Sequence, residues 1–173
     1  MERLRNIHTG QAVSIIGKGP SLQHIRPEHI EQGPVIALYQ ALIPVEAMQI
    51  DNPVYSLQKD HADTVPKMAT LLLHLHESKD CLPDYQPRII FDNNDFGIPW
   101  NAFSQITAVK IAQFMGCNRV NFVCFDSFTT GSNATYIPGK GITDPNHDNY
   151  QKQKVIIADF LLTFEHKFIT PQP

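Results

Sequence analysis

The chain has 173 residues, a formal net charge of −3 and an ordinary globular composition, with 42% hydrophobic and 18% charged residues. This length predicts one domain with a substantial core and argues against two independent catalytic modules. The mildly acidic charge, without a Lys/Arg cluster, argues against extended DNA or RNA as a partner, because binding to a phosphate backbone needs a basic surface. A single nucleotide is compatible with this charge.

The first residues lead into no apolar stretch of secretory type, and the longest apolar runs are far shorter than the roughly 20 residues of a membrane span. We therefore expect a cytoplasmic protein without a membrane span. Its three cysteines, Cys81, Cys117 and Cys124, form no Cys-x-x-Cys pair, so reduced thiols are expected rather than a disulfide framework or a thiolate zinc site. The sequence leaves homo-oligomerisation open.

Short apolar runs rich in β-branched residues alternate with longer mixed segments, which is the pattern of βαβ units. Strands are predicted, in chain order, at residues 12–16, 35–38, 54–57, 71–75, 88–91 and 119–125. These runs are apolar on both faces, as the strands of a parallel sheet covered by helices must be. The predicted fold class is α/β: a single-domain, Rossmann-like, mostly parallel doubly wound sheet with helices on both faces.

Two helices are predicted from apolar residues that recur at helical spacing. The first covers residues 104–115, and Gly116 stands where its C-terminal cap belongs. The second covers residues 150–166 and closes the domain. Residues 127–149, between the last predicted strand and this helix, are polar and much longer than a usual connection. We expect a lid or binding loop there, with a mobile solvated loop as the alternative.

A glycine-rich turn directly follows the first predicted strand. It consists of Gly17, Lys18, Gly19, Pro20 and Ser21, followed by Leu22. In doubly wound sheets such a turn meets phosphate through backbone N–H groups, because glycine permits close approach. The spacing matches neither the dinucleotide fingerprint nor the Walker A motif, so a tight strand-to-helix turn without a ligand is the alternative.

The residues of this turn are more specific than its spacing. Residues 15–22 resemble the opening loop of the Rossmann-like superfamily that includes bacterial CMP-sialic-acid sialyltransferases and hydroxymethylpterin pyrophosphokinase-like proteins. Many of these proteins carry Gly-x-Gly-Pro-Ser-Leu at that place. Residues 35–40 and 104–126 look similar to further stretches of the superfamily, so the resemblance spans roughly residues 12–127 in the family's order.

The resemblance implies that the turn and the ends of neighbouring strands bind the phosphate and sugar of a nucleotide or nucleotide-sugar donor. It places Gln40 and Ser104 in this site, makes Tyr136 a contact to the donor phosphate, and makes His147 the general base.

The sequence also departs from the sialyltransferase pattern. Lys18 and Tyr39 stand where the sialyltransferases typically carry asparagine, so CMP-sialic acid itself is not carried over as the donor. Lys18 is expected instead to bring a point charge to a phosphate.

Two carboxylates stand at the carboxyl ends of predicted strands, which is the edge where open α/β sheets bind ligands. Asp60 and Asp126 are therefore expected to accept hydrogen bonds from sugar hydroxyls or to hold a metal. The alternatives are a solvated turn for Asp60 and a structural cap for Asp126.

No metal site is assigned from the sequence. His74 and His76 would share one face of a strand, with His61 and Asp63 as further ligands, but histidines on a strand are more often structural than metal-binding. Residues 92–97 begin like a calcium-binding loop but have Phe96 at the fifth position, so a turn is predicted there.

These observations predict a nucleotide-dependent transferase, glycosyl or phosphoryl, whose substrate is a nucleotide or nucleotide sugar; no other cofactor is assigned. The resemblance favours glycosyl transfer of the sialyltransferase kind. In this hypothesis the turn holds phosphate oxygens and His147 deprotonates an acceptor hydroxyl. The alternatives are a nucleotide-binding protein without catalysis and a structural module that retains only the fold.

Overall fold

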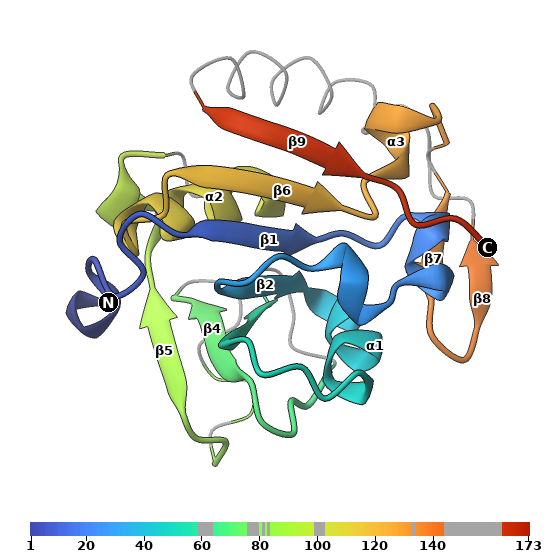
Figure 1. The fold of residues 1–173 in the computed structure, drawn as a ribbon. Coiled ribbons are helices and arrows are strands. Elements are labelled where there is room, and N and C mark those ends of the chain that lie inside the picture. The colour runs from blue at the N-terminus through green and yellow to red at the C-terminus, as the bar shows by residue number, and fades with distance from the viewer. Residues whose placement is uncertain are drawn as a thin grey trace.

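The computed structural model describes residues 1–58, 64–75, 80, 82, 84–98, 103–132, 134–143 and 164–173. Seven strands form one sheet in the order β5-β4-β3-β2-β1-β6-β9, and every neighbouring pair is parallel (Figure 1). The strands are β1 (Ala12–Ile16), β2 (Val35–Leu38), β3 (Val54–Gln58), β4 (Thr70–His74), β5 (Arg88–Phe91), β6 (Arg119–Val123) and β9 (Glu165–Ile169). The predicted α/β class and Rossmann-like parallel sheet are confirmed.

Strand β9 was not predicted. The sequence places residues 165 and 166 at the end of a helix, and this prediction is wrong because both residues pair with β6, starting from Arg119 opposite Glu165. The side chains of β9 are only partly buried, as is typical of an edge strand, so its sequence lacks the continuous apolar run of the inner strands. The rest of the predicted helix, residues 150–163, lies outside the described residues.

Helices are short apart from α2, which confirms the helix predicted at residues 104–115. The α-helices are α1 (Leu42–Ala47), α2 (Ser104–Phe114) and α3 (Asp126–Thr129), and the 3-10 helices are η1 (Glu2–Leu4), η2 (Pro20–His24), η3 (Pro27–His29), η4 (Tyr39–Ala41) and η5 (Asn93–Phe96). The connection from β1 to β2 contains 3-10 helices instead of an α-helix. Pro20 and Pro27 each start one of them, and a proline beyond the first turn would interrupt a longer helix.

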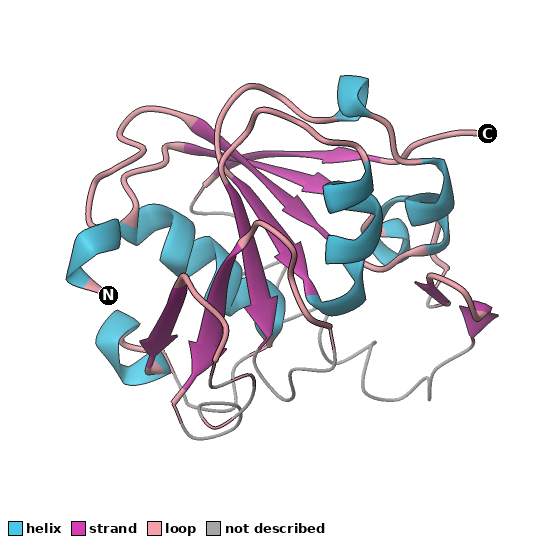
Figure 2. Ribbon diagram, turned by 90° about the horizontal axis from the view of Figure 1, so that it is seen from below, coloured by secondary structure: helices cyan, strands magenta, loops and turns pink. Residues whose placement is uncertain are grey.

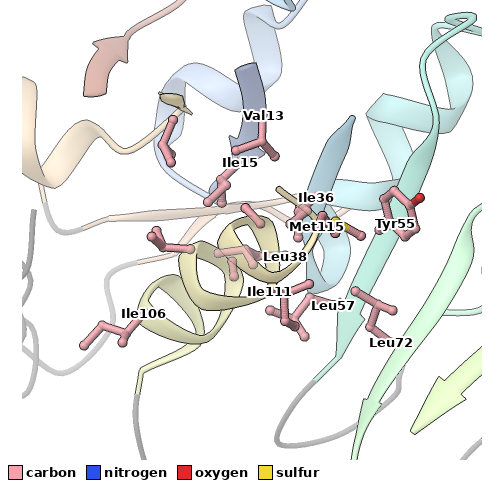
Figure 3. Packing of buried hydrophobic residues seen from close by; sticks show 14 of the residues in the cluster. Val13, Ile15, Ile36, Leu38, Tyr55, Leu57, Leu72, Ile106, Ile111 and Met115 are labelled. Carbon is pink, nitrogen blue, oxygen red and sulfur yellow. The ribbon is translucent and has the colours of Figure 1, made fainter. Parts of the chain in front are cut away.

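The sheet has an apolar core on each face. One core includes Val13 and Ile15 of β1 and packs against α2, as Figure 3 shows. The other includes Ile16 of β1 and packs against Leu42 and Val45 of α1. Because side chains alternate along a strand, β1 supplies both cores, and helices lie on both sides of the sheet (Figure 2).

The segment expected as a lid or binding loop contains regular structure where it is described. Helix α3 starts it, and β7 (Thr135–Ile137) then pairs with β8 (Gly141–Thr143) in an antiparallel hairpin. The Tyr136 N–H donates to the Lys18 carbonyl at 2.7 Å, so this hairpin lies against the turn after β1. Residues 134–143 thus form a hairpin that bonds to itself and to the turn, and the role of residues 127–149 as a lid or binding loop stays a prediction.

Two further expectations concern the turn at residues 92–97 and the state of the cysteines. Residues 92–97 form a turn as predicted, in which Asp92 caps η5 and Gly97 is left-handed at φ 66°. Cys117 and Cys124 are free thiols, whereas Cys81 lies outside the described residues.

Within the described part of the chain, no helix has the length and apolar character needed to cross a bilayer.

An ion-pair network joins Glu31, in the connection before β2, to strands β6 and β9 on the other side of β1. Arg119 Nη2 on β6 lies 2.6 Å from Glu31 Oε2, and Lys167 Nζ on β9 bonds the other carboxylate oxygen. Lys167 contributes most to lowering the pKa of Glu31 to about 2. The Asn121 amide and the Arg119 guanidinium also contribute to this lowering.

We predict that Glu31→Gln reduces acid sensitivity. Because the folded-state pKa of Glu31 lies below its ordinary value of 4.5, its carboxylate stabilises the fold above that pH, and this stabilisation is lost as the pH falls toward 2. The network is partly exposed, so the loss in Glu31→Gln at pH 7 should be about 1 kcal/mol or less. Urea unfolding at several pH values measures it, with Glu28→Gln on the same segment as the control. A Glu31→Gln profile parallel to the parent's between pH 5 and 3 would contradict the assignment.

Candidate functional site

The topology places a candidate ligand-binding edge next to β1. From β1 the chain adds β2 to β5 on one side of the sheet, and it then returns to add β6 and β9 on the other. In open α/β sheets, ligands bind beyond the carboxyl ends of the strands at such a switch point. Here the switch point lies between β1 and β6, so residues 17–21 and 124–126 meet at this edge.

The turn after β1 is bonded directly to the end of β6. The Gly17 N–H donates to the Val123 carbonyl at 2.8 Å, and the Gly19 N–H donates to the Cys124 carbonyl at 2.9 Å. An added Cβ at Gly19 would lie 1.9 Å from Oδ2 of Asp126 and 2.7 Å from the Cys124 oxygen. Glycine is therefore required here because two strand ends come close together.

Asp126 completes this junction from the start of α3. Its carboxylate accepts the Ser21 N–H at 3.1 Å on Oδ1 and the Ser21 hydroxyl at 2.7 Å on Oδ2. Both side chains are buried. Asp126 thus fills a structural role of the kind considered as its alternative, although the turn it holds is the one after β1.

These bonds change the expected mode of phosphate binding. The N–H groups of Gly17, Gly19 and Ser21 all have protein acceptors, and Pro20 has no N–H to offer. These three N–H groups are therefore engaged within the protein in this conformation, and phosphate binding by the turn stays a prediction. The turn instead positions the side chain of Lys18.

Lys18 stands at the centre of a second group of predicted residues. Its Nζ donates to Gln40 Oε1 at 3.1 Å and lies 5.0 Å from the centre of the Tyr39 ring. The Tyr39 hydroxyl is 2.8 Å from Ser104 Oγ, in the first turn of α2. Three segments that are distant in the sequence therefore bring Lys18, Gln40 and Ser104 together around one tyrosine.

Tyr39 is the residue of this group that sequence reasoning missed. It adopts a left-handed backbone with φ 51° directly after β2, and Cys124 does the same with φ 61° directly after β6. Non-glycine residues rarely hold this conformation, and they cluster at functional sites. Nothing in the sequence around Tyr39 signals this backbone conformation.

The cysteine beside the turn is not suited to nucleophilic chemistry. Burial is the main cause that raises the pKa of the Cys124 thiol to about 12; the nearby Asp126 carboxylate also acts to raise this pKa, whereas the Ser21 side chain acts to lower it. The thiol is therefore neutral near pH 7, and a thiolate is needed for attack. Burial likewise raises the pKa of Cys117 to about 11.

The remaining predicted site residues are Tyr136, Asp60 and His147, and of these the structure describes only Tyr136. Tyr136 reaches the turn through its backbone N–H, so its phenol as a phosphate contact stays a prediction. Asp60 and His147 lie outside the described residues.

The histidine pair considered for a metal is described only in part. His74 is fully buried at the end of β4, edge-to-face with the Phe91 ring at 5.4 Å. His61, Asp63 and His76 lie outside the described residues, and the described ones contain no cluster of three or more potential metal ligands.

Comparison with known proteins adds no relative: no family model matches this chain, and no curated protein matches it. The resemblance of the turn to the sialyltransferase superfamily accordingly stays a prediction.

We predict that Gly19→Ala destabilises the protein. Gly19 has an ordinary φ of −63°, so the cost is steric and comes from the Asp126 carboxylate and the Cys124 carbonyl. Overpacking of this kind costs about 1–3 kcal/mol, measurable by urea unfolding. The control is Gly139→Ala, where the added Cβ meets open space and the cost is that of a left-handed backbone alone, about 1 kcal/mol. A smaller cost for Gly19→Ala than for the control would contradict the close packing of β1 and β6.

Proposed function

We propose that this protein is a nucleotide-dependent transferase that binds a nucleotide or nucleotide sugar at the carboxyl edge of β1 and β2. The observation that carries the proposal is the convergence of Lys18, Gln40 and Ser104 around Tyr39 beside the switch point. A cation, an amide and a hydroxyl are the groups that recognise phosphate and ribose, and open α/β sheets bind nucleotides at this place.

The phosphate is expected to contact the Lys18 ammonium. Lysine is a compact point charge on a flexible stem, so Nζ can turn from Gln40 toward a ligand oxygen. Gln40 and Ser104 would then meet sugar hydroxyls. The Tyr39 ring limits the positions of the ammonium, because a cation is held over the face of an aromatic ring.

In the transfer step an acceptor hydroxyl attacks the transferred group. A new bond forms to the acceptor oxygen, the bond to the donor phosphate breaks, and the hydroxyl proton passes to a base. His147 is the proposed base, since imidazole titrates near neutral pH. The Lys18 ammonium would stabilise the charge that develops on the leaving phosphate.

Binding without catalysis is the second candidate function. The observation that favours it is the structural use of Ser21 and Asp126, which hold the turn instead of facing a ligand. Nucleotide binding without turnover would support this candidate. Binding of no nucleotide would support a structural module.

The first prediction is nucleotide-dependent stabilisation. A ligand at about 100 times its dissociation constant adds roughly 2.7 kcal/mol of stability. Thermal unfolding with CMP, UDP, GDP and ATP derivatives should therefore identify the nucleobase that the protein prefers. Lys18→Met should weaken binding about tenfold, because a charge-assisted hydrogen bond to phosphate is lost. Lys67→Met, which removes the same charge from an exposed position before β4, is the control. Equal affinity in the two variants would remove Lys18 from the site.

The second prediction concerns the base. His147→Ala should reduce turnover by about 10²–10⁴-fold, while the dissociation constant of the donor stays within a few fold. Steady-state kinetics and calorimetry measure the two effects separately. Near-parental turnover rules out the base, and loss of donor binding would make His147 a phosphate contact instead.

A further inference from the structure

Three polar side chains from β6 and β9 lie next to one another at the amino edge of the sheet, opposite the candidate nucleotide site. Arg119 and Asn121 are two residues apart on β6, and Lys167 of β9 is the register partner of Asn121. Because side chains alternate along a strand, the three share one face of the sheet. We call Arg119, Asn121 and Lys167 the amino-edge cradle.

The cradle already holds one oxyanion, the carboxylate of Glu31. Arg119 Nη2 donates to Glu31 Oε2 at 2.6 Å, and Lys167 Nζ donates to Oε1. Glu31 does not belong to the sheet but to the connection between η3 and β2. The sheet therefore supplies the cations and a separate segment supplies this anion. A second carboxylate, that of Glu165 on β9, has its Oε1 3.8 Å from Arg119 Nη1.

A carboxylate leaves part of this polar surface unused. Asn121 is fully buried, and its amide is near enough to lower the pKa of Glu31, yet neither Nδ2 nor Oδ1 forms a hydrogen bond of normal geometry to a described residue. Arg119 Nε is also buried and forms no such hydrogen bond to a described residue. The same holds for the hydroxyl of Ser14, the register partner of Asn121 on β1. A buried polar group without a hydrogen-bond partner destabilises the fold, so a larger oxyanion has groups to satisfy here.

The cradle also has access from solvent. An open hollow of about 560 Å³ adjoins it, lined by Gly10, Gln11, Ala12, Glu31, Gln32 and Arg119. This volume is within the range of small-molecule sites. Arg119 and Glu31 belong both to the hollow and to the ion pair, so a ligand in the hollow meets the cradle at the position that Glu31 occupies.

We propose that the amino-edge cradle is a binding site for a phosphate group, free or carried on a small molecule, and that Glu31 is a built-in occupant which this ligand displaces. Phosphate offers more oxygens than a carboxylate, so it can satisfy the Asn121 amide and Arg119 Nε in addition to the two cations. The site is at the other edge of the sheet from Lys18 and does not depend on the proposed transferase function.

Calorimetry with inorganic phosphate, at constant ionic strength, tests this site. Glu31→Ala empties the cradle and should bind phosphate at least about tenfold more tightly than the parent, because the competing carboxylate is gone. Glu28→Ala is the matched control on the same segment, where the carboxylate lies 3.9 Å from Arg26 Nη1 in an exposed pair. The double variant Glu31→Ala/Lys167→Met should lose the gain. Glycerol phosphate binding more tightly than inorganic phosphate would identify an ester as the ligand.

Equal phosphate affinity in Glu31→Ala and Glu28→Ala would overturn the proposal, and so would a gain that survives Lys167→Met. If Glu31→Ala does not fold, NMR of the parent decides. Signals of the Arg119 Nε–H and the Asn121 amide should shift with phosphate but not with an equal ionic strength of chloride, and no shift would falsify the site. The same shifts in Lys18→Met show that the phosphate is bound at this edge rather than at the nucleotide site.

Discussion

The junction between β1 and β6 is the contact on which the rest of the carboxyl edge depends. About a hundred residues separate these two strands, yet the turn after β1 bonds to the last carbonyls of β6, and Asp126 holds Ser21 from the other side. The approach is close enough that no side chain fits at Gly19. A junction this tight orients the turn rigidly, and it leaves Lys18 pointing toward the end of β2, where Gln40 and Tyr39 receive it.

This arrangement gives the glycine-rich turn a different role from the one that such turns have in many nucleotide-binding sheets. In many nucleotide-binding sheets the glycines expose N–H groups to phosphate. Here the glycine N–H groups bond to β6, and the 3-10 helix η2 follows in place of an α-helix. Less of the phosphate charge would then be met by aligned backbone groups, so a side-chain cation becomes the main electrostatic contribution. Lysine at position 18, where the resembled sialyltransferases carry asparagine, is consistent with that shift.

The connection from β1 to β2 also links the two edges of the sheet. It begins at the turn of the candidate nucleotide site and reaches Glu31, whose carboxylate is bound by Arg119 and Lys167 at the amino edge. Between these ends, Leu22 is buried in the core on the α1 side of the sheet, and Ile25 and Ile30 pack against the same core. The structure thus places one charged cluster at each end of a segment of about fifteen residues.

The sequence by itself determined the strands β1 to β6 and helix α2, because their apolar runs and periodicity are local properties that burial on both faces of a sheet requires. It also predicted that the turn at residues 17–21, Gln40 and Asp126 lie together, since parallel strands end at a common edge, and the family resemblance added Ser104. Only the tertiary structure decided how they interact. The bonds of Gly19 to Cys124 and of Ser21 to Asp126, the contact of Tyr39 with Ser104, the pairing of β9 with β6 and the ion pairs of Glu31 all join residues far apart in the chain. Their partners are set by strand order and register, which no local pattern encodes.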